Sequence, residues 1–501
     1  MSKFYVTTAI AYVNAAPHIG FALEVIQADV LARYHRLKGD DTFYLTGTDE
    51  HGVKLYEIAR EIGEDTQVFA DKNAEKFKAL KGVLNLSNDD FIRTTSDRHK
   101  AGAQKLWQKM VESGDLYKDS YKGLYCVGCE SFVSEKDLDE NGHCPNHKKK
   151  PKILEEENYF FRLSKYSDRV KDAIEKDELK IVPESRKNEM LNIIGKEGLR
   201  DVSFSRPRDV LPWGVDVPND PDQVMYVWCD ALSNYITAME YETEGERFQK
   251  YWPCDAHIIG KDILRFHAGY WPAMLMSAGI SMPKAVYVHG FITSEGQKMS
   301  KSLGNVVDPL EYVDKYGADA LRYFLMREIP TTDDGDFSHG RFLEVYNSEL
   351  ANGLGNLVNR VVMMTERYCE GKVPEKTDGK GLYDNMKVVL GKYDGMMEKF
   401  DLKMACEATS ELVNLGNKYI DDKKPWAMAK EDEKRVAPVM YDLLELLRYV
   451  AFMISPFIPE TAEKIAMQIG LDKIVYEKNW GVLEMGTSVR KADLLFPRLE
   501  E

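Results

Sequence analysis

Two lysines stand three positions apart in the segment GQKMSKSLG, which spans residues 296–304. A glycine brackets the segment at each end, and small hydroxyl residues follow Met299, so a mobile loop is expected rather than a helix. Lysine carries a mobile point charge that suits phosphate. Lys298 and Lys301 therefore predict a site for an anion that binds and leaves again.

A second candidate for anion binding is the turn Pro17-His18-Ile19-Gly20. Apolar residues recur every three or four positions from this turn to Gly39, so a helix is expected to begin there. His18 would lie at the N-terminus of that helix, where free amides and the helix dipole favour anions. Taken alone, the turn is more typical of a capping histidine beside a packing glycine.

Both motifs belong to a repeated strand–helix–strand pattern. The expected strands are residues 4–10, 42–45, 256–259 and 285–288, and the expected helices are 17–39 and 262–278. Such units build a Rossmann-like, doubly wound parallel sheet, whose ligands bind at the carboxyl ends of the strands. Since each motif follows a strand, both should open at one edge of the sheet.

The rest of the chain divides around this sheet. The two halves are separated by roughly 200 residues, too many for a loop in a compact domain. After about residue 342, apolar residues recur at helical spacing, which predicts an all-α helical bundle. The predicted division is a first catalytic half at 1–116, an insertion at 117–225, a second catalytic half at 226–296, a loop and stem-contact segment at 297–345, and a helical domain at 346–501.

The insertion contains a candidate metal site, Cys126-x2-Cys129-x14-Cys144-x2-His147. Two close pairs of ligands separated by a loop of this length are typical of a tetrahedral zinc knuckle with three cysteines and one histidine. All four positions are filled by protein, so one structural Zn²⁺ is expected, which would stabilise an insertion too small for a core of its own. His143 is an alternative fourth ligand.

Composition limits partners and location. The chain has 67 lysines and arginines against 82 aspartates and glutamates, a net charge of −15, so nucleic acid binding must rely on local basic patches. No membrane span or signal peptide is predicted. The chain ends near Glu501 without an appended dimerisation module, so a monomer is expected. A reducing cytoplasm is favoured because four of the seven cysteines stand alone: Cys229, Cys254, Cys369 and Cys406.

In this order and on these elements, PHIG and KMSKS resemble the two signatures of class I aminoacyl-tRNA synthetases. The resemblance implies that the anion is the triphosphate of ATP, bound with Mg²⁺, and that His18, Lys298 and Lys301 are catalytic because they stabilise developing charge. Further ATP-binding residues implied by it are Pro17, Gly20, Gly260, Asp262, His289, Gly290, Met299 and Ser300. Phe21 departs from the family pattern His-x-Gly-His, so a non-catalytic, tRNA-binding paralogue is the alternative.

Three segments resemble the methionyl-tRNA synthetase family: TGTDEHG at 46–52, YVWCDALSNY at 226–235 and HIIGKDILRFHAGYWPAML at 257–275. The resemblance implies an aromatic pocket for L-methionine, whose polarizable thioether gains from ring contacts, with a carboxylate for its ammonium group. The implied residues are Ile10, Tyr12, Asp49, Trp228, Ala231, Tyr235, His267 and Trp271. A ligase for leucine, isoleucine or valine would carry a far larger insertion, and a small adenylyltransferase would not need the helical domain.

The helical domain contains candidates for reading RNA. Asn356 and Arg360 are four positions apart and so share a helix face, while Pro425 holds Trp426 as a stacking platform for an unstacked base. By resemblance, these four residues read the CAU anticodon of tRNA-Met. The family likeness implies activation of methionine by ATP to methionyl-adenylate and pyrophosphate, followed by transfer of methionine to the 3′ end of tRNA-Met.

Overall fold

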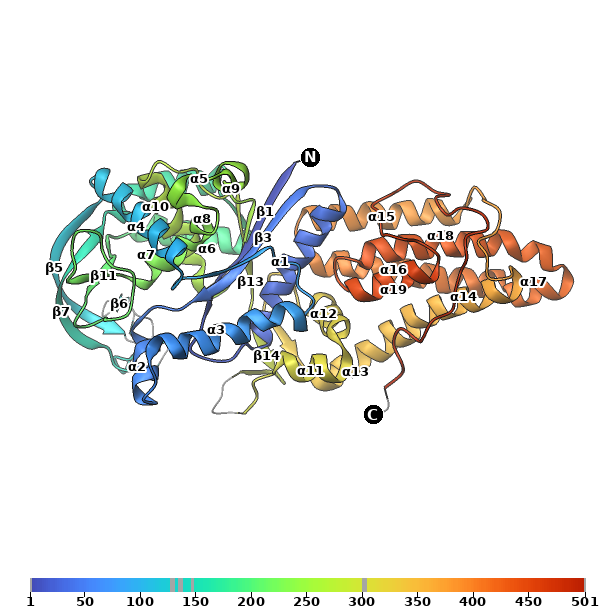
Figure 1. Ribbon diagram of the computed structural model, residues 1–501, viewed down its shortest axis with the longest axis horizontal. Helices are drawn as coiled ribbons and strands as arrows, with labels where there is room; N and C mark the ends of the chain where they lie inside the picture. Colours follow the sequence, from blue (N-terminus) through green and yellow to red (C-terminus); the bar gives the residue numbers. More distant parts are fainter. Residues whose placement is uncertain (1, 127–130, 134–137, 146–147, 300–303, 500–501) are drawn as a thin grey trace.

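The computed structural model describes residues 2–126, 131–133, 138–145, 148–299 and 304–499. An α/β part and a helical part lie end to end along the long axis of the molecule (Figure 1). None of the helices in these ranges is both long and apolar enough to cross a membrane.

A seven-stranded sheet lies at the centre of the α/β part. Its order is β2-β3-β1-β12-β13-β8, with β4 beside β3, and every neighbouring pair is parallel. The predicted parallel α/β sheet is confirmed. Its strands are β1 (Lys3–Thr8), β2 (Ala11–Tyr12), β3 (Asp41–Asp49), β4 (Asp90–Arg93), β8 (Lys180–Val182), β12 (Ala256–Gly260) and β13 (Ala285–His289).

The helix predicted to begin at the PHIG turn is α1 (Ile19–Leu37), which connects β1 to β3. It is buried along most of its length because the sheet covers one side and α12 (Ala318–Arg327) packs on another. The other helices of this part are α2 (Val53–Glu61), α3 (Thr66–Val83), α4 (Asp97–Glu112), α7 (Val227–Leu232), α8 (Asn234–Thr237) and α9 (Glu246–Tyr251).

The helix predicted at 262–278 is confirmed, since residues 261–277 are helical without interruption, but the helix type changes along it. The segment begins with a 3₁₀ turn, η4 (Lys261–Ile263), includes a π-helical turn, η5 (Phe266–Tyr270), and ends with α10 (Trp271–Ser277). Pro272 explains the π turn because it has no N–H to donate to the preceding turn. The N–H of Trp271 bonds five residues back, to the Phe266 carbonyl, which is the π pattern.

Residues 117–225 build a second, antiparallel sheet and also return to the first one. The second sheet has the order β6-β5-β7-β9, while β8 from the same stretch pairs with β13 at the edge of the central sheet. The elements are β5 (Leu116–Cys126), β6 (Ser131–Val133), β7 (Lys152–Phe161), α5 (Ser167–Glu175), α6 (Glu184–Glu197), β9 (Val202–Ser203), β10 (Ser205–Pro207) and β11 (Gln223–Met225).

After β13 the chain forms a small three-stranded sheet that connects the two parts. Its order is β15-β14-β16, in which β15 contains the first residues of the GQKMSKSLG segment. The elements of this connection are β14 (Ile292–Ser294), β15 (Gln297–Lys298), α11 (Pro309–Tyr316), α12, β16 (Gly335–Phe337) and α13 (His339–Val345).

The predicted helical domain is confirmed. The long helix α18 is buried all round, and α14, α15, α16 and α19 pack on it (Figure 1). The helices are η7 (Tyr346–Gly355, a π-helix), α14 (Asn356–Tyr368), α15 (Leu382–Glu398), α16 (Leu402–Lys423), α17 (Pro425–Glu431), α18 (Val436–Ile454) and α19 (Pro459–Gln468).

One hydrophobic core runs from the sheet through α1 and α12 into the helical domain. Arg322 of α12 lies fully buried where the two parts meet, 2.7 Å from the equally buried Asp29 of α1. Its guanidinium also donates to the carbonyl oxygens of Pro456 and Phe457, in the turn between α18 and α19. Burial raises the pKa of Asp29, but the charges of Arg322 and Arg33 outweigh that effect and hold it below its ordinary value.

Candidate active site

The carboxyl ends of β1, β3, β12 and β13 meet at one edge of the central sheet because these strands are parallel. Four predicted site residues, Ile10, Asp49, Gly260 and His289, stand at or just beyond these ends. The PHIG turn follows β1 and the GQKMSKSLG segment follows β13 by way of β14. Both motifs therefore leave the sheet at the edge where the sequence predicts them.

His18 caps the N-terminus of α1. The backbone N–H of Gly20 donates to His18 Nδ1 at 3.1 Å, so a neutral ring carries its proton on Nε2. A Cβ on Gly20 would lie 3.0 Å from the imidazole, which explains why glycine occupies this position. The exposed ring presents its Nε2–H as a donor for an anion at the positive end of the helix dipole. The first amides of the helix are already bonded, since Ile19 N–H donates to the Val307 carbonyl and Gly20 N–H to His18 Nδ1.

Phe21 turns away from the anion side of the helix. Its ring packs edge-on against Phe77 of α3, with 5.1 Å between the ring centroids, and is partly buried between two hydrophobic clusters. The side chain therefore serves packing between α1 and α3. His18 is the histidine of this turn, and its ring is exposed.

The ATP-binding residues predicted near β12 and β13 lie close together. A Cβ on Gly260 would stand 2.9 Å from Asp262 Oδ1 and 3.8 Å from His289 Cε1, while Gly290 has its Cα against the backbone of residues 333–334. His289 Nδ1–H donates to the Gly290 carbonyl, and its Nε2 lies 2.9 Å from Glu24 Oε2. Burial lowers the pKa of His289, but the hydrogen bond and charge of Glu24 raise it above its ordinary value.

The cation-bearing loop is described only in part. Lys298 ends β15, where its backbone pairs with Thr293 of β14, and Met299 is partly buried against the main core. The side chain of Lys298 and the whole of Ser300 and Lys301 lie outside the described residues. Their predicted roles toward phosphate therefore stay predictions.

A pocket of about 300 Å³ opens at the same edge of the sheet. Seven of the eight predicted methionine-binding residues line it: Ile10, Tyr12, Asp49, Trp228, Ala231, Tyr235 and His267. Ala9, Lys54, Val227, Leu232, Asn234 and Ile263 complete the wall. The eighth predicted residue, Trp271, lies behind this wall: it is fully buried, its ring stands 5.9 Å from that of Tyr235, and its Nε1–H donates to His257.

The floor of the pocket is a neutral hydrogen-bonded pair, Tyr235 and His267. His267 Nδ1–H donates to the Ile263 carbonyl at 3.0 Å, so a neutral ring has its lone pair on Nε2, which accepts from the Tyr235 hydroxyl at 2.7 Å. Burial lowers the pKa of His267 to about 4. Trp228 stacks on Phe266 at 3.7 Å and forms one aromatic wall. The arrangement offers rings and an uncharged hydroxyl to an apolar, polarizable side chain.

Sequence reasoning missed a buried polar array behind the pocket. Asp230, on α7 between the pocket residues Trp228 and Ala231, lies 2.6 Å from both His51 Nδ1 and His99 Nε2, and all three side chains are buried. Burial raises the pKa of Asp230, but the two histidines outweigh it and hold it far below its ordinary value. The sequence shows only DEH at the end of β3, three consecutive ionisable residues, which does not reveal the pairing with Asp230.

Glu50, the middle residue of this tripeptide, points to the other side of the loop. It is fully buried and forms a two-pronged ion pair with Arg93 at 2.7 and 2.8 Å. Thr48 and Thr95 also donate to its carboxylate, and the Trp213 indole N–H donates to its carbonyl. Glu50 and His51 thus anchor the end of β3 through bonds to Arg93 and Asp230. These bonds fix the neighbouring Asp49 at the mouth of the pocket.

The candidate zinc site is described only in part. Cys126, at the end of β5, and Cys144 are both buried, and the backbone around Cys144 closes a tight turn through Lys148 and Lys149. Cys129 and His147 lie outside the described residues, and no group of three or more metal-binding side chains occurs among those that are described. Two buried thiols, one at the end of β5 and one in a turn, fit a zinc knuckle, which stays a prediction.

The residues predicted to read RNA come together at the far end of the helical domain. Arg360 of α14 is paired with Asp421 of α16 at 2.7 Å, and its guanidinium lies 5.9 Å from the Trp426 ring. Pro425 begins α17 and is buried, whereas Trp426 is 42% exposed and Asn356 is exposed one turn before Arg360. The face therefore presents an open aromatic ring beside an amide and a guanidinium.

Comparisons with known proteins agree with this geometry. A family model described as "tRNA synthetases class I (M)" matches residues 4–151 and 140–362, and one described as "Anticodon binding domain of methionyl tRNA ligase" matches residues 371–501. The fold is thus that of a class I aminoacyl-tRNA synthetase. The chain belongs to the methionyl-tRNA synthetase family.

Individual relatives match along nearly the whole chain. The methionine–tRNA ligase of Caldanaerobacter subterraneus subsp. tengcongensis is 45% identical over 99% of this chain and 79% of its own length. The methionine–tRNA ligase of Brucella suis biovar 1 is 44% identical over 100% of this chain and 98% of its own length. The structure of Mycobacterium tuberculosis methionyl-tRNA synthetase in complex with methionyl-adenylate is 40% identical, with a TM-score of 0.95 over 99% of this chain and 100% of that one.

Proposed function

We propose that this chain activates L-methionine with Mg²⁺-bound ATP to methionyl-adenylate and pyrophosphate, then transfers methionine to the 3′ end of tRNA-Met. The observation that carries the proposal is the single pocket that gathers seven of the eight predicted methionine-binding residues at the sheet edge. Methionine would place its ammonium group at Asp49 and its thioether against Tyr235, His267 and the ring of Trp228. Trp271 supports these residues from behind.

Activation needs positioning and charge stabilisation rather than a covalent enzyme intermediate. The methionine carboxylate attacks the α-phosphate of ATP, and the bond to pyrophosphate breaks. His18, through its Nε2–H at the positive end of α1, would receive the triphosphate, while Lys298 and Lys301 would neutralise the departing pyrophosphate. Gly260, Asp262 and His289 would hold the nucleoside, with Pro17, Gly20, Gly290, Met299 and Ser300 around it.

Recognition of tRNA-Met is assigned to the far end of the helical domain. An anticodon base would stack on Trp426, and Asn356 and Arg360 would hydrogen-bond base edges. The domain boundaries we propose remain 1–116, 117–225, 226–296, 297–345 and 346–501, with 297–345 contacting the tRNA stem. We also propose that the protein acts as a monomer in the cytoplasm.

A structural Zn²⁺ is assigned to Cys126, Cys129, Cys144 and His147. The metal would hold the two turns of the insertion together and take no part in the reaction. Metal analysis tests this directly: one zinc per chain is expected in the wild type and in His143→Ala, and a loss of zinc in His147→Ala. The reverse pattern would assign His143 as the fourth ligand.

The function is tested by amino-acid-dependent exchange between ATP and pyrophosphate, with methionine as the substrate and leucine, isoleucine and cysteine, each alone, as controls. Exchange with methionine alone is expected. Tyr235→Phe should raise the methionine KM by roughly 5- to 150-fold, because it leaves the buried Nε2 acceptor of His267 unpaired at a cost of about 1–3 kcal/mol. Tyr393→Phe is the matched control, since it removes a buried hydroxyl that has no hydrogen-bond partner among the described residues.

Two outcomes would contradict the proposal. Exchange with another amino acid in place of methionine would reassign the pocket. A folded protein that binds tRNA-Met but shows no exchange with any amino acid would be a binding paralogue, the alternative that Phe21 raises.

A further inference from the structure

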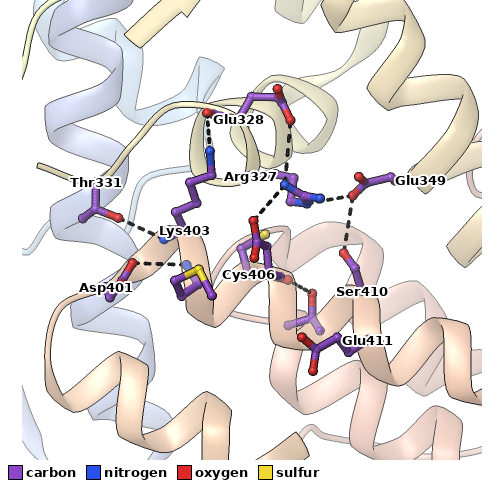
Figure 2. A network of polar contacts seen from close by, with 12 residues as sticks. Arg327, Glu328, Thr331, Glu349, Asp401, Lys403, Cys406, Ser410 and Glu411 are labelled. Atoms are coloured by element: carbon purple, nitrogen blue, oxygen red, sulfur yellow. Dashed lines mark hydrogen bonds and ion pairs between the residues drawn. The ribbon is translucent and has the colours of Figure 1, made fainter. Parts of the chain in front are cut away.

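A polar network joins α12, which lies next to the central sheet, to the helices η7 and α16 (Figure 2). These two helices lead toward the RNA-reading face, by which we mean the surface formed by Asn356, Arg360 and Trp426. Its centre is Arg327, the last residue of α12. The guanidinium lies 3.0 Å from Glu349 of η7, 3.2 Å from Glu407 of α16 and 3.7 Å from the neighbouring Glu328. One side chain thus connects three separate segments of the chain.

Further bonds close the network on both sides of Arg327. The Tyr323 hydroxyl, one turn earlier on α12, donates to Glu349 Oε2 at 2.6 Å and lies 2.7 Å from the Ser410 hydroxyl. Lys403 of α16 donates its backbone N–H to Thr331 and its ammonium group to the Glu328 carbonyl (Figure 2). The junction is therefore held by directional bonds between named groups.

A cavity interrupts side-chain packing at this junction. It has a volume of about 120 Å³ and is lined by residues of α12, η7 and α16, including Tyr323, Arg327, Glu349 and Ser410. Interlocked apolar side chains fix the angle between helices where they pack tightly. Here the cavity interrupts that packing beside a core that continues through the junction, and the polar bonds around it add directional contacts between α12 and η7.

The network is continuous with both functional ends of the molecule. On one side, Thr331 accepts a hydrogen bond from Gln27 of α1, the helix that begins at His18. On the other side, η7 runs directly into α14, so Glu349 lies seven residues before Asn356. The second helix, α16, carries both Glu407 and Asp421, which is the partner of Arg360.

We propose that Arg327 is a positioning residue for aminoacyl transfer. By fixing η7 and α16 against α12, it sets the distance and angle between the RNA-reading face and the active site, so that a tRNA held at Trp426 brings its 3′ end to the adenylate. The inference rests on the proposed function. It concerns only aminoacyl transfer, the step that needs the RNA-reading face and the active site at once.

Arg327→Gln tests the inference with three measurements on the full chain. Methionine-dependent ATP–pyrophosphate exchange without tRNA should be unchanged, since α1 and the pocket keep their contacts. Binding of an isolated anticodon stem-loop should also be unchanged. Aminoacylation of full-length tRNA-Met should lose about tenfold in kcat/KM, a typical size for coupling between two sites. Arg247→Gln, which removes an exposed arginine paired with Glu240 at 3.5 Å on the catalytic side, is the matched control and should change none of these.

Glu349→Gln separates positioning from direct contact of Arg327 with RNA. Positioning predicts that this variant also loses aminoacylation and that the double variant with Arg327→Gln is no worse than either single one, because both break the same interaction. If Arg327 instead contacts an RNA phosphate, Glu349→Gln should improve aminoacylation, since removing a carboxylate would favour RNA binding. Tyr323→Phe should weaken transfer in the same direction.

The inference is overturned if Arg327→Gln aminoacylates tRNA-Met as fast as the wild type. It is also overturned if exchange falls in parallel with transfer, which would indicate general structural damage, or if Glu349→Gln improves aminoacylation. Failure of the proposed function looks different, because the wild type itself would then show no methionine-dependent exchange.

Discussion

Replacing Asp230 by asparagine would test whether the array behind the pocket holds the methionine site in shape. The carboxylate accepts from His51 and His99, both at 2.6 Å, and all three side chains are buried. Hydrogen bonds to an ionised group are worth about 1.5–3 kcal/mol each. The asparagine variant should therefore lose roughly 3–5 kcal/mol of stability, as expected when a buried charged network is broken.

The assay is thermal unfolding followed by methionine kinetics. A loss of this size should lower the unfolding temperature of the α/β part by roughly 6–20 °C. The methionine KM should rise as well, because Asp230 holds α7, which carries Trp228 and Ala231 into the pocket. Asp172→Asn, at an exposed pair with Lys176, is the control and should shift neither quantity.

The pH dependence follows from the lowered pKa of Asp230. A carboxyl group with a depressed folded-state pKa stabilises the fold above its unfolded value of about 3.9, and that contribution disappears as the pH falls through the folded-state value. The difference between wild type and Asp230→Asn should therefore be full at pH 7 and shrink below about pH 4. Equal unfolding temperatures at pH 7, or an unchanged KM, would refute the reasoning.

Four further predictions concern other parts of the molecule. Phe21→His should keep or raise the exchange rate, measured with saturating ATP, because Phe21 serves only packing; a large fall would show a role of its own. Trp426→Ala should raise the KM for tRNA-Met by about 10- to 100-fold at unchanged exchange, since stacking is worth about 1–3 kcal/mol per base, and an unaltered KM would remove it from recognition. Because the pKa of His267 is lowered to about 4, stability should fall as the pH drops from about 6.5 toward 4, and His267→Gln should show a shallower slope in denaturation at several pH values. Arg322→Met should cost about 3–5 kcal/mol in chemical denaturation, because Asp29 loses a buried partner; a loss below about 1 kcal/mol would contradict the buried-pair argument.

Much of the fold could be predicted because its strands and helices carry strong periodic patterns. The first βαβ unit and the helical domain follow from apolar spacing over long segments. The edge strand β8 could not be found this way, since Lys180–Val182 is too short to show a period. The π turn within the helix at 262–278 escaped for a different reason: the apolar pattern of the segment is helical throughout, and only Pro272 marks the position of the turn.

The site was predictable where its residues stand in recognisable segments, such as Asp49 in TGTDEHG. Trp271 shows the limit of this approach, since its segment is correct but the side chain faces His257 behind the pocket. The array around Asp230 was not predictable, because His51 and His99 lie 179 and 131 residues away in the chain. Pairing over such separations depends on how the elements pack, which periodicity does not report.

The shared core has a consequence for exchanging parts between relatives. Although the helical domain looks like a separate body in Figure 1, a cut near residue 345 would strip apolar partners from α1 and deprive Arg322 of the carbonyls of Pro456 and Phe457. A chimera that takes its RNA-reading end from one relative must therefore also inherit α12 and matching residues on α1. Specificity for tRNA can change at the far end of the helical domain, but the residues that pack the two parts together must come from the same relative.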